Sequence, residues 1–176
     1  MRKEEGRRKK EVKKRDRTKK NRWIEVEAMN HEFTIVTDTS TVAIFDLAAI
    51  RHRFDDTSDW WSIPEDELDE MNQGHILFLG VGHDGQYHIS IVDQLENADG
   101  LLHMKAPTGQ IFVGAGEDTT GGELEPDDSP AVSGAMLTMN PGNYAVTYRM
   151  EHNTIQLSFI PSEQGTNTLV APIRLK

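Results

Sequence analysis

A strict two-residue alternation in the segment YAVTYRMEHNTIQLSFIP, residues 144–161, constrains the fold of this chain more than any other feature. A tight turn at His152 and Asn153 would place the apolar residues of both arms opposite one another on one face. The expected pairs are Met150 with Ile155, Tyr148 with Leu157, Val146 with Phe159, and Tyr144 with Pro161. A slip of one residue would move every apolar side chain to the polar face, so the alternation predicts a hairpin in one defined register.

Other short segments rich in β-branched and aromatic residues predict further strands. They are FTIVT (33–37), TVAIF (41–45), IFV (111–113), AMLTM (135–139) and LVAPIRL (169–175), and a second hairpin is expected to turn at Asp84-Gly85 within residues 75–92. Short helices are expected at 47–54 and 62–74, the latter with Pro64 in its first turn and Gly74 at its end. This pattern predicts a mainly β fold, an antiparallel β-sandwich or partly open barrel with one or two short helices.

The charge of the chain is divided between two parts of opposite sign. Residues 1–28 contain 13 Lys and Arg against 6 Asp and Glu, a net charge of +7, whereas residues 29–176 contain 6 against 23, a net charge of −17. The sequence therefore predicts a basic arm over 1–28, disordered or helical, and a single acidic β-rich domain over 29–176. Such a domain repels nucleic acid and anionic membranes and attracts basic proteins.

Three interpretations of the basic arm stay open. Met29 is the natural start and residues 1–28 are not native, or the arm binds nucleic acid, or it forms a helix that packs on the acidic domain. Nucleic acid is therefore expected as a partner only through residues 1–28.

Several classes of protein lack their sequence signatures here. There is no cysteine, so disulfides, thiol nucleophiles and cysteine zinc sites are excluded. No apolar run is long enough to span a membrane and no secretory signal precedes the domain, so we expect a cytoplasmic protein. The chain has neither a phosphate-binding Gly-Lys-Ser/Thr loop nor a G-x-S-x-G nucleophile motif. A non-enzymatic protein without a cofactor is the favoured expectation.

The segment DDTSDWWSIPEDELDEM, residues 55–71, contains eight carboxylates, two adjacent tryptophans and no basic residue. The tryptophans are either structural, one in the core and one at the base of the acidic helix, or anchors of an interface ringed by carboxylates. The preferred contact region comprises Asp55, Asp56, Asp59, Trp60, Trp61, Glu65, Asp66, Glu67, Asp69 and Glu70. A second candidate surface comprises Glu117, Asp118, Glu123, Glu125, Asp127 and Asp128.

These features predict an acidic binding protein that docks on a basic protein partner, such as an inhibitor or immunity protein for a toxin. The alternative is a β-sandwich that binds a metal or small ligand and could act as an enzyme. Its site would lie near His83 and His88, with Asp84 or His75 as a third ligand. No H-x-H or H-E-x-x-H spacing supports a metal, so none is expected in the first interpretation.

Four segments carry a resemblance to known proteins: TDTSTVAIFDLAAIRHRFDDTSDWWSIP, GHILFLGVGHDGQYHISIV, IFVGAGEDTTGG and NPGNYAVTYR. Over residues 33–161 the chain resembles a family of small uncharacterised bacterial β-rich proteins. The strand entry Pro141-Gly142-Asn143-Tyr144, with Gly-Ala-Gly-Glu upstream, is similar in layout to competence protein J, a cytoplasmic inhibitor of a bacterial nuclease. The resemblance implies a β-sandwich and an inhibitor or immunity role, and it implies no particular site residue.

Overall fold

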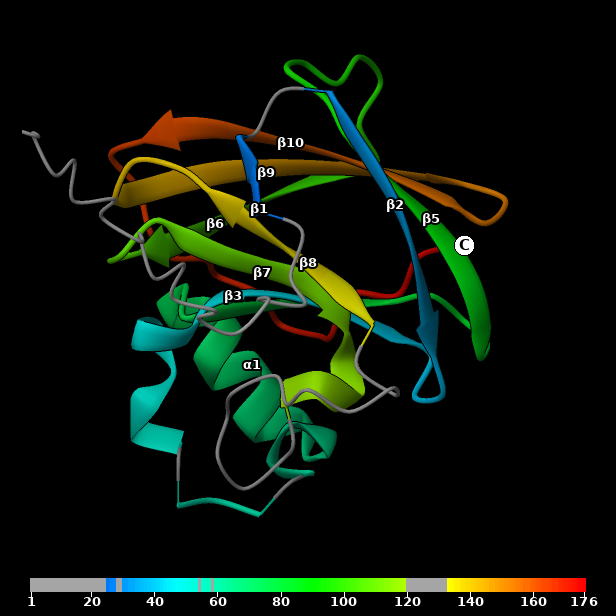
Figure 1. Cartoon of the computed structure of the whole chain (residues 1–176). Helices are drawn as coiled ribbons and strands as arrows, with labels where there is room; N and C mark the ends of the chain where they lie inside the picture. Colours follow the sequence, from blue (N-terminus) through cyan, green and yellow to red (C-terminus); the bar gives the residue numbers. More distant parts are fainter. Residues whose placement is uncertain (1–24, 28–29, 54, 58, 120–132) are drawn as a thin grey trace, which may run out of the picture.

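The computed structural model describes residues 25–27, 30–53, 55–57, 59–119 and 133–176, which form two stacked β-sheets (Figure 1). Sheet A contains, in spatial order, β1 (Glu25–Glu27), β8 (Gly134–Thr138), β7 (Gln110–Ala115), β3 (Thr41–Asp46) and β4 (Ile76–Gly80). Sheet B contains β2 (His31–Thr37), β5 (Gly85–Ile91), β10 (Thr154–Ser162), β9 (Gly142–Glu151) and β6 (Gly100–Ala106). All neighbours are antiparallel except β1 with β8 and β5 with β10. The prediction of a mainly β, sandwich-like fold is confirmed.

Strand β1 lies within the predicted basic arm and pairs with β8. The rest of the arm, residues 1–24 and 28, lies outside the described residues.

Strands β9 and β10 form the hairpin that the alternation predicted. Its register joins Met150 to Ile155, Tyr148 to Leu157, Val146 to Phe159 and Tyr144 to Pro161. Tyr144, Val146 and Tyr148 are buried on the inner face, as are Ile155 and Leu157. The inner face of this hairpin supplies much of the wall that sheet B presents to the core.

The predicted hairpin at Asp84-Gly85 is wrong, because its two strands belong to different sheets. Strand β4 pairs with β3 in sheet A, whereas β5 pairs with β2 and β10 in sheet B. All five residues of β4 are buried, so this strand has no solvent-exposed face whose polar residues would favour pairing with the next strand in the sequence. Segment 169–175 is also not a strand, and it contributes one bridge between Gly80 and Arg174.

One α-helix and several 3₁₀ turns cover sheet A on the side away from β9 and β10 (Figure 1). Helix α1 spans Pro64–Gln73, and Gly74 ends it in the left-handed conformation with φ 73°, as the sequence predicted. The helix expected at 47–54 is replaced by two 3₁₀ turns, η1 (Leu47–Ala49) and η2 (Arg51–Arg53). Further turns are η3 (Trp60–Ser62) and η4 (Gly116–Thr119).

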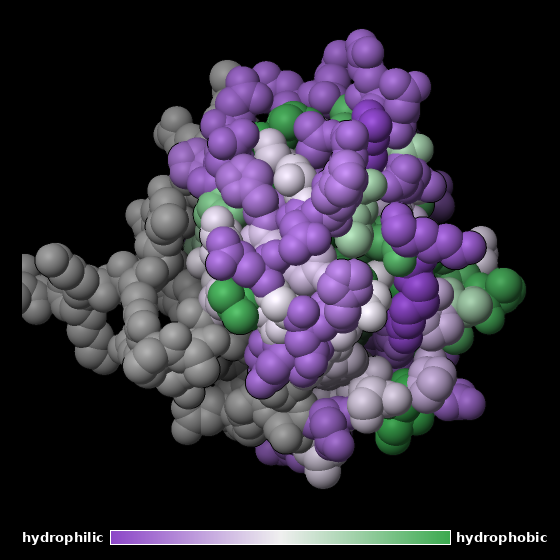
Figure 2. Space-filling view, turned by 90° about the vertical axis from the view of Figure 1, so that its right-hand side faces the viewer, coloured by the Kyte–Doolittle hydropathy of each residue, from purple (hydrophilic) through white to green (hydrophobic). Residues whose placement is uncertain are grey.

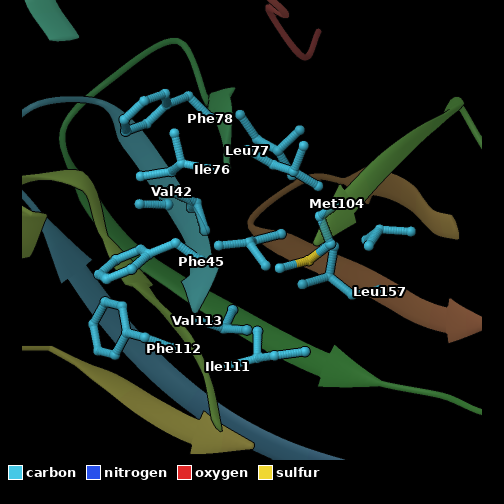
Figure 3. Packing of buried hydrophobic residues seen from close by; sticks show 14 of the residues in the cluster. Val42, Phe45, Ile76, Leu77, Phe78, Met104, Ile111, Phe112, Val113 and Leu157 are labelled. Carbon is cyan, nitrogen blue, oxygen red and sulfur yellow. The ribbon is translucent and has the colours of Figure 1, made fainter. Parts of the chain in front are cut away.

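The hydrophobic core lies between the sheets and continues beneath α1. Phe45 and Phe112 pack with their ring centroids 5.2 Å apart. On the face of sheet A that is directed toward sheet B, Leu77 of β4 lies near Met104 and Leu157 (Figure 3). Each fully buried side chain of this size stabilises the fold by roughly 1.5–3 kcal/mol.

The face seen in Figure 2 is mainly hydrophilic, and its apolar residues stand in small separate groups. In the described part of the chain, no helix combines the length and the apolar character needed to cross a membrane.

Candidate functional site

The acidic segment 55–71 runs through η3 and α1, and its carboxylates differ in how deeply they are buried. Glu67 and Glu70 are buried, with 4% and 2% of their surface exposed, and Asp66 is half-buried. The exposed members are Asp55, Asp56, Asp59, Glu65 and Asp69. The predicted contact region is thus part surface and part interior, and its buried members Trp60, Glu67 and Glu70 cannot touch a partner directly.

Both tryptophans of this segment pack on Phe78 of β4. The ring centroids lie 6.0 Å apart for Trp60 and 5.2 Å apart for Trp61, whose ring is stacked on Phe78. Trp60 is 3% exposed and has the guanidinium of Arg53 4.8 Å from its ring centroid. The exposed large apolar side chain of this region is Ile63 instead, at 50%.

The buried carboxylate of Glu70 forms the centre of a partly exposed polar cluster, which we call the Glu70 cluster: His52, Arg53, Glu70 and His75. Glu70 Oε1 lies 2.7 Å from His52 Nε2 and 2.8 Å from Arg53 Nε, and Oε2 lies 2.8 Å from His75 Nδ1. Burial alone would raise the pKa of Glu70, but hydrogen bonds from His52, Arg53 and His75 lower it below its usual range. Glu70 is therefore ionised, and each of its three partners donates a hydrogen bond.

Arg53 ties η2 to α1 by contacting three carboxylates at once. Besides Glu70, its Nη1 donates to Asp56 Oδ2 at 2.8 Å and its Nη2 donates to Asp66 Oδ1 at 3.2 Å. The planar guanidinium suits this arrangement because its donors point outward in a fixed fork. One cation therefore compensates three of the eight acids in the segment.

The second buried carboxylate, Glu67, meets Arg174 from the C-terminal segment. Its oxygens lie 3.3 Å from Nη1 and 3.4 Å from Nη2 of Arg174. The backbone on either side of Arg174 is held by Gly80, whose N–H donates to Ile173 O at 3.1 Å and whose carbonyl accepts from Leu175 N at 2.7 Å. Glu67 thus joins α1 to the chain segment that covers the edge of β4.

The second candidate surface begins with Glu117, which is half-buried and fixes the turn between β2 and β3. Its carboxylate accepts hydrogen bonds from Thr37 Oγ1 at 2.9 Å, Thr39 Oγ1 at 2.7 Å and the Asp38 N–H at 2.8 Å. The nearby charge of Glu117 raises the pKa of Asp38. Asp118 lies in η4, and nothing is described of its side chain. Glu123, Glu125, Asp127 and Asp128 lie outside the described residues.

The two histidines of the alternative hypothesis do not converge with a third ligand. His83 lies against Tyr87, with ring centroids 6.4 Å apart, and His88 Nε2 lies 3.6 Å from Glu32 Oε2. Within the described ranges, neither belongs to a group of three metal-type ligands.

Such a group does occur in the Glu70 cluster, where His52, Glu70 and His75 each offer an atom within 4.8 Å of the others. A divalent cation at this position would lie beside the guanidinium of Arg53, which already donates to Glu70 Oε1. The donor set therefore fits a hydrogen-bonded cluster better than a metal centre.

Sequence reasoning missed the Glu70 cluster, although one signal for it was present. Glu67, Glu70 and Met71 occupy positions i, i+3 and i+4 of α1, so they share one side of the helix. Met71 is the fully buried apolar residue of that side. An inward-facing methionine could therefore have identified the two glutamates as interior residues.

Comparisons with known proteins place the chain in a family without supplying a function. No curated protein matches the chain. It is similar to one solved structure, described as "Crocagin biosynthetic gene J", with 17% sequence identity, a TM-score of 0.47, and coverage of 76% of this chain and 97% of that chain. None of these findings links the chain to competence protein J, and that resemblance stays a prediction. A family model described as "Family of unknown function (DUF6386)" matches residues 29–175, so the protein belongs to this family.

Proposed function

We propose that the protein is an acidic, non-enzymatic binding module that docks on a basic protein through the exposed carboxylates beside α1. The proposal rests on one observation about ion pairing. Arg53 compensates Asp56, Asp66 and Glu70, and Arg174 compensates Glu67. The four other acids are exposed and have no ion-pair partner in the described part of the chain: Asp55, Asp59, Glu65 and Asp69.

Unpaired charges of one sign repel one another, and a basic partner would relieve that repulsion. Glu65 and Asp69 are four residues apart on one face of α1, where like charges destabilise a helix by about 0.2–0.5 kcal/mol. The exposed Ile63 immediately precedes this helix and supplies an apolar centre beside the charges. An apolar anchor surrounded by charged residues is the composition expected of a steered protein interface.

The charge of the domain also suggests the class of partner. Residues 29–176 carry a net charge of −17. Enzymes that degrade nucleic acids are basic because their substrates are anionic, and their inhibitors are complementary in charge. A basic toxin of this type is the partner that we propose, with the module acting as its inhibitor or immunity protein.

The test compares three forms of the full chain as baits in pull-downs from the native host, with bound proteins identified by mass spectrometry. They are the wild type, the double variant Glu65→Lys with Asp69→Lys, and a control with Asp93→Lys and Glu96→Lys. The control reverses two exposed charges in the loop after β5, away from α1. Replacing Asp66 and Glu67 would be a poor test, because these acids hold Arg53 and Arg174.

A basic protein retained by the wild type and the control, released by raised salt and lost with the α1 variant, supports the proposal. Equal capture by all three baits, or capture of no basic protein, contradicts it.

A further inference from the structure

A pocket of about 380 Å³ lies beside the Glu70 cluster, at the other end of α1 from Ile63. Its volume falls within the range of roughly 300–1,000 Å³ that is common for small-molecule sites. The apolar part of its lining includes Ala48, Ala49 and Pro107, and the polar part includes His75, Lys105 and Asn143. Three separate chain segments and His75, two residues beyond the end of α1, therefore meet at one hollow.

The walls of this pocket are held in place by the buried carboxylate of Asp46. Asp46 Oδ1 accepts from the Ala48 N–H at 3.0 Å, which fixes η1. Asp46 Oδ2 accepts from Thr108 N and Thr108 Oγ1, both at 2.8 Å, and from Gly109 N at 3.0 Å, which fixes the turn after Pro107. Four donors on one buried acid give the pocket a formed shape without a ligand.

His75 lines this pocket and keeps one ring nitrogen available for a ligand. Its Nδ1 donates to Glu70 Oε2 at 2.8 Å, because an ionised carboxylate can only accept. Its Nε2 has no hydrogen-bond partner among the residues that the structure describes. In the neutral ring, Nε2 is then an acceptor, as in histidines that a buried carboxylate orients for proton transfer.

Lys105 contributes a cation that is not paired with any acid in the described part of the chain. It is one of only two lysines in residues 29–176, a region with 23 acids. Its backbone N–H donates to Gly74 O at 2.7 Å, which fixes β6 against the end of α1. Its ammonium forms no ion pair with the described residues.

We propose that this pocket binds a small 2-hydroxy carboxylate. The ligand carboxylate pairs with Lys105, the hydroxyl donates to His75 Nε2, and the apolar body rests on Ala48, Ala49 and Pro107. A singly charged ligand fits better than a phosphate, because the pocket lies at the C-terminal end of α1, where the helix dipole is negative. This site is separate from the proposed docking surface and does not depend on it.

The test titrates ¹⁵N-labelled full chain with three related probes and follows the amide signals of His75, Lys105 and Asn143. The probes are mandelate, phenylacetate, which lacks the hydroxyl, and mandelamide, which lacks the charge. We expect saturable shifts with mandelate, about tenfold weaker binding of phenylacetate for the loss of one hydrogen bond, and no saturation with mandelamide.

Two variants show whether the binding of mandelate depends on Lys105. Lys105→Met retains the apolar stem and removes the charge, and it should weaken mandelate binding at least about tenfold without changing the thermal midpoint. Lys176→Met, at an exposed lysine away from the pocket, should bind as the wild type does. The proposal is overturned if no probe gives saturable shifts, if mandelamide or phenylacetate binds as tightly as mandelate, or if Lys105→Met binds normally.

Discussion

Arg53 and Glu70 form a partly buried ion pair, in which Arg53 Nε donates to Glu70 Oε1 at 2.8 Å and links η2 to α1. The same oxygen accepts from His52, and the other oxygen accepts from His75. The acidic helix is therefore attached to the sandwich through one of its own carboxylates. This arrangement separates the acids that hold the fold from the acids that face solvent.

Glu70→Gln should destabilise the protein by about 3 kcal/mol, because it leaves Arg53 and two imidazoles around a group without charge. Asp69→Asn is the matched control. The carboxylate of Asp69 is exposed and unpaired among the described residues, so this substitution should change the free energy of unfolding by less than about 0.5 kcal/mol. Urea denaturation of both variants measures the difference, and equal stabilities would show that the cluster contributes little.

The Glu70 cluster should also make stability depend on acidity. The pKa of Glu70 in the folded state lies below its ordinary value of 4.5. Its stabilising contribution is therefore complete above that value and is lost as the pH falls through the folded-state pKa. The free energies of unfolding of the wild type and Glu70→Gln should converge as the pH is lowered below 4.5. A constant difference between the two down to the acid transition would contradict this assignment.

Two glycines with positive φ offer a matched test of how tightly the end of α1 packs against the backbone at Gly165. A Cβ at Gly74, with φ 73°, would overlap Gly165 O, whereas a Cβ at Gly82, with φ 88°, would meet nothing within 4 Å. Gly82→Ala should therefore cost about 1 kcal/mol of backbone strain. Gly74→Ala should cost at least about 2 kcal/mol more, because the backbone of the two segments must separate. Similar losses in urea denaturation would mean that the two segments are not in tight contact.

Ile63→Ser should weaken binding of the basic partner while leaving the protein folded. Ile63 is half exposed, so its replacement removes little buried area from the fold. Because Ile63 is the apolar centre of the proposed surface, Ile63→Ser should weaken binding by at least about 1 kcal/mol, measured by calorimetry with the captured partner. Val170→Ser, at an apolar residue that is 96% exposed, is the control. Unchanged affinity for Ile63→Ser would remove this residue from the interface.

The sequence predicted the parts of the fold in which local pattern and final partner agree. The β9–β10 hairpin has one apolar and one polar face, so its register followed from the residues alone. Helix α1 carried Pro64 at its start and Gly74 at its end, and both signals are local.

The partners of fully buried strands could not be predicted in the same way. Strand β4 is apolar on both faces, so its pattern does not distinguish a hairpin with β5 from a pair with β3. The chain bends at residues 82–84 instead of forming the expected turn at Asp84-Gly85, and it passes from one sheet to the other there.

The site was harder still, because eight carboxylates in one segment look alike in sequence. Only the positions of His52, Arg53 and Arg174, brought to α1 by the tertiary fold, decide which acids are interior.

The pairing of β5 with β10 has a consequence for how the chain acquires its structure during synthesis. Within the described sheets, β9 and β10 are neighbours joined by a tight turn, whereas β2, β5 and β10 meet only across long stretches of sequence. Strand β5 needs β10 to cover its second edge, and β10 follows the other described strands in the sequence. Sheet B therefore completes only once β10 has been synthesised, and the slow step of folding should be the pairing of the β9–β10 hairpin with the free edge of β5.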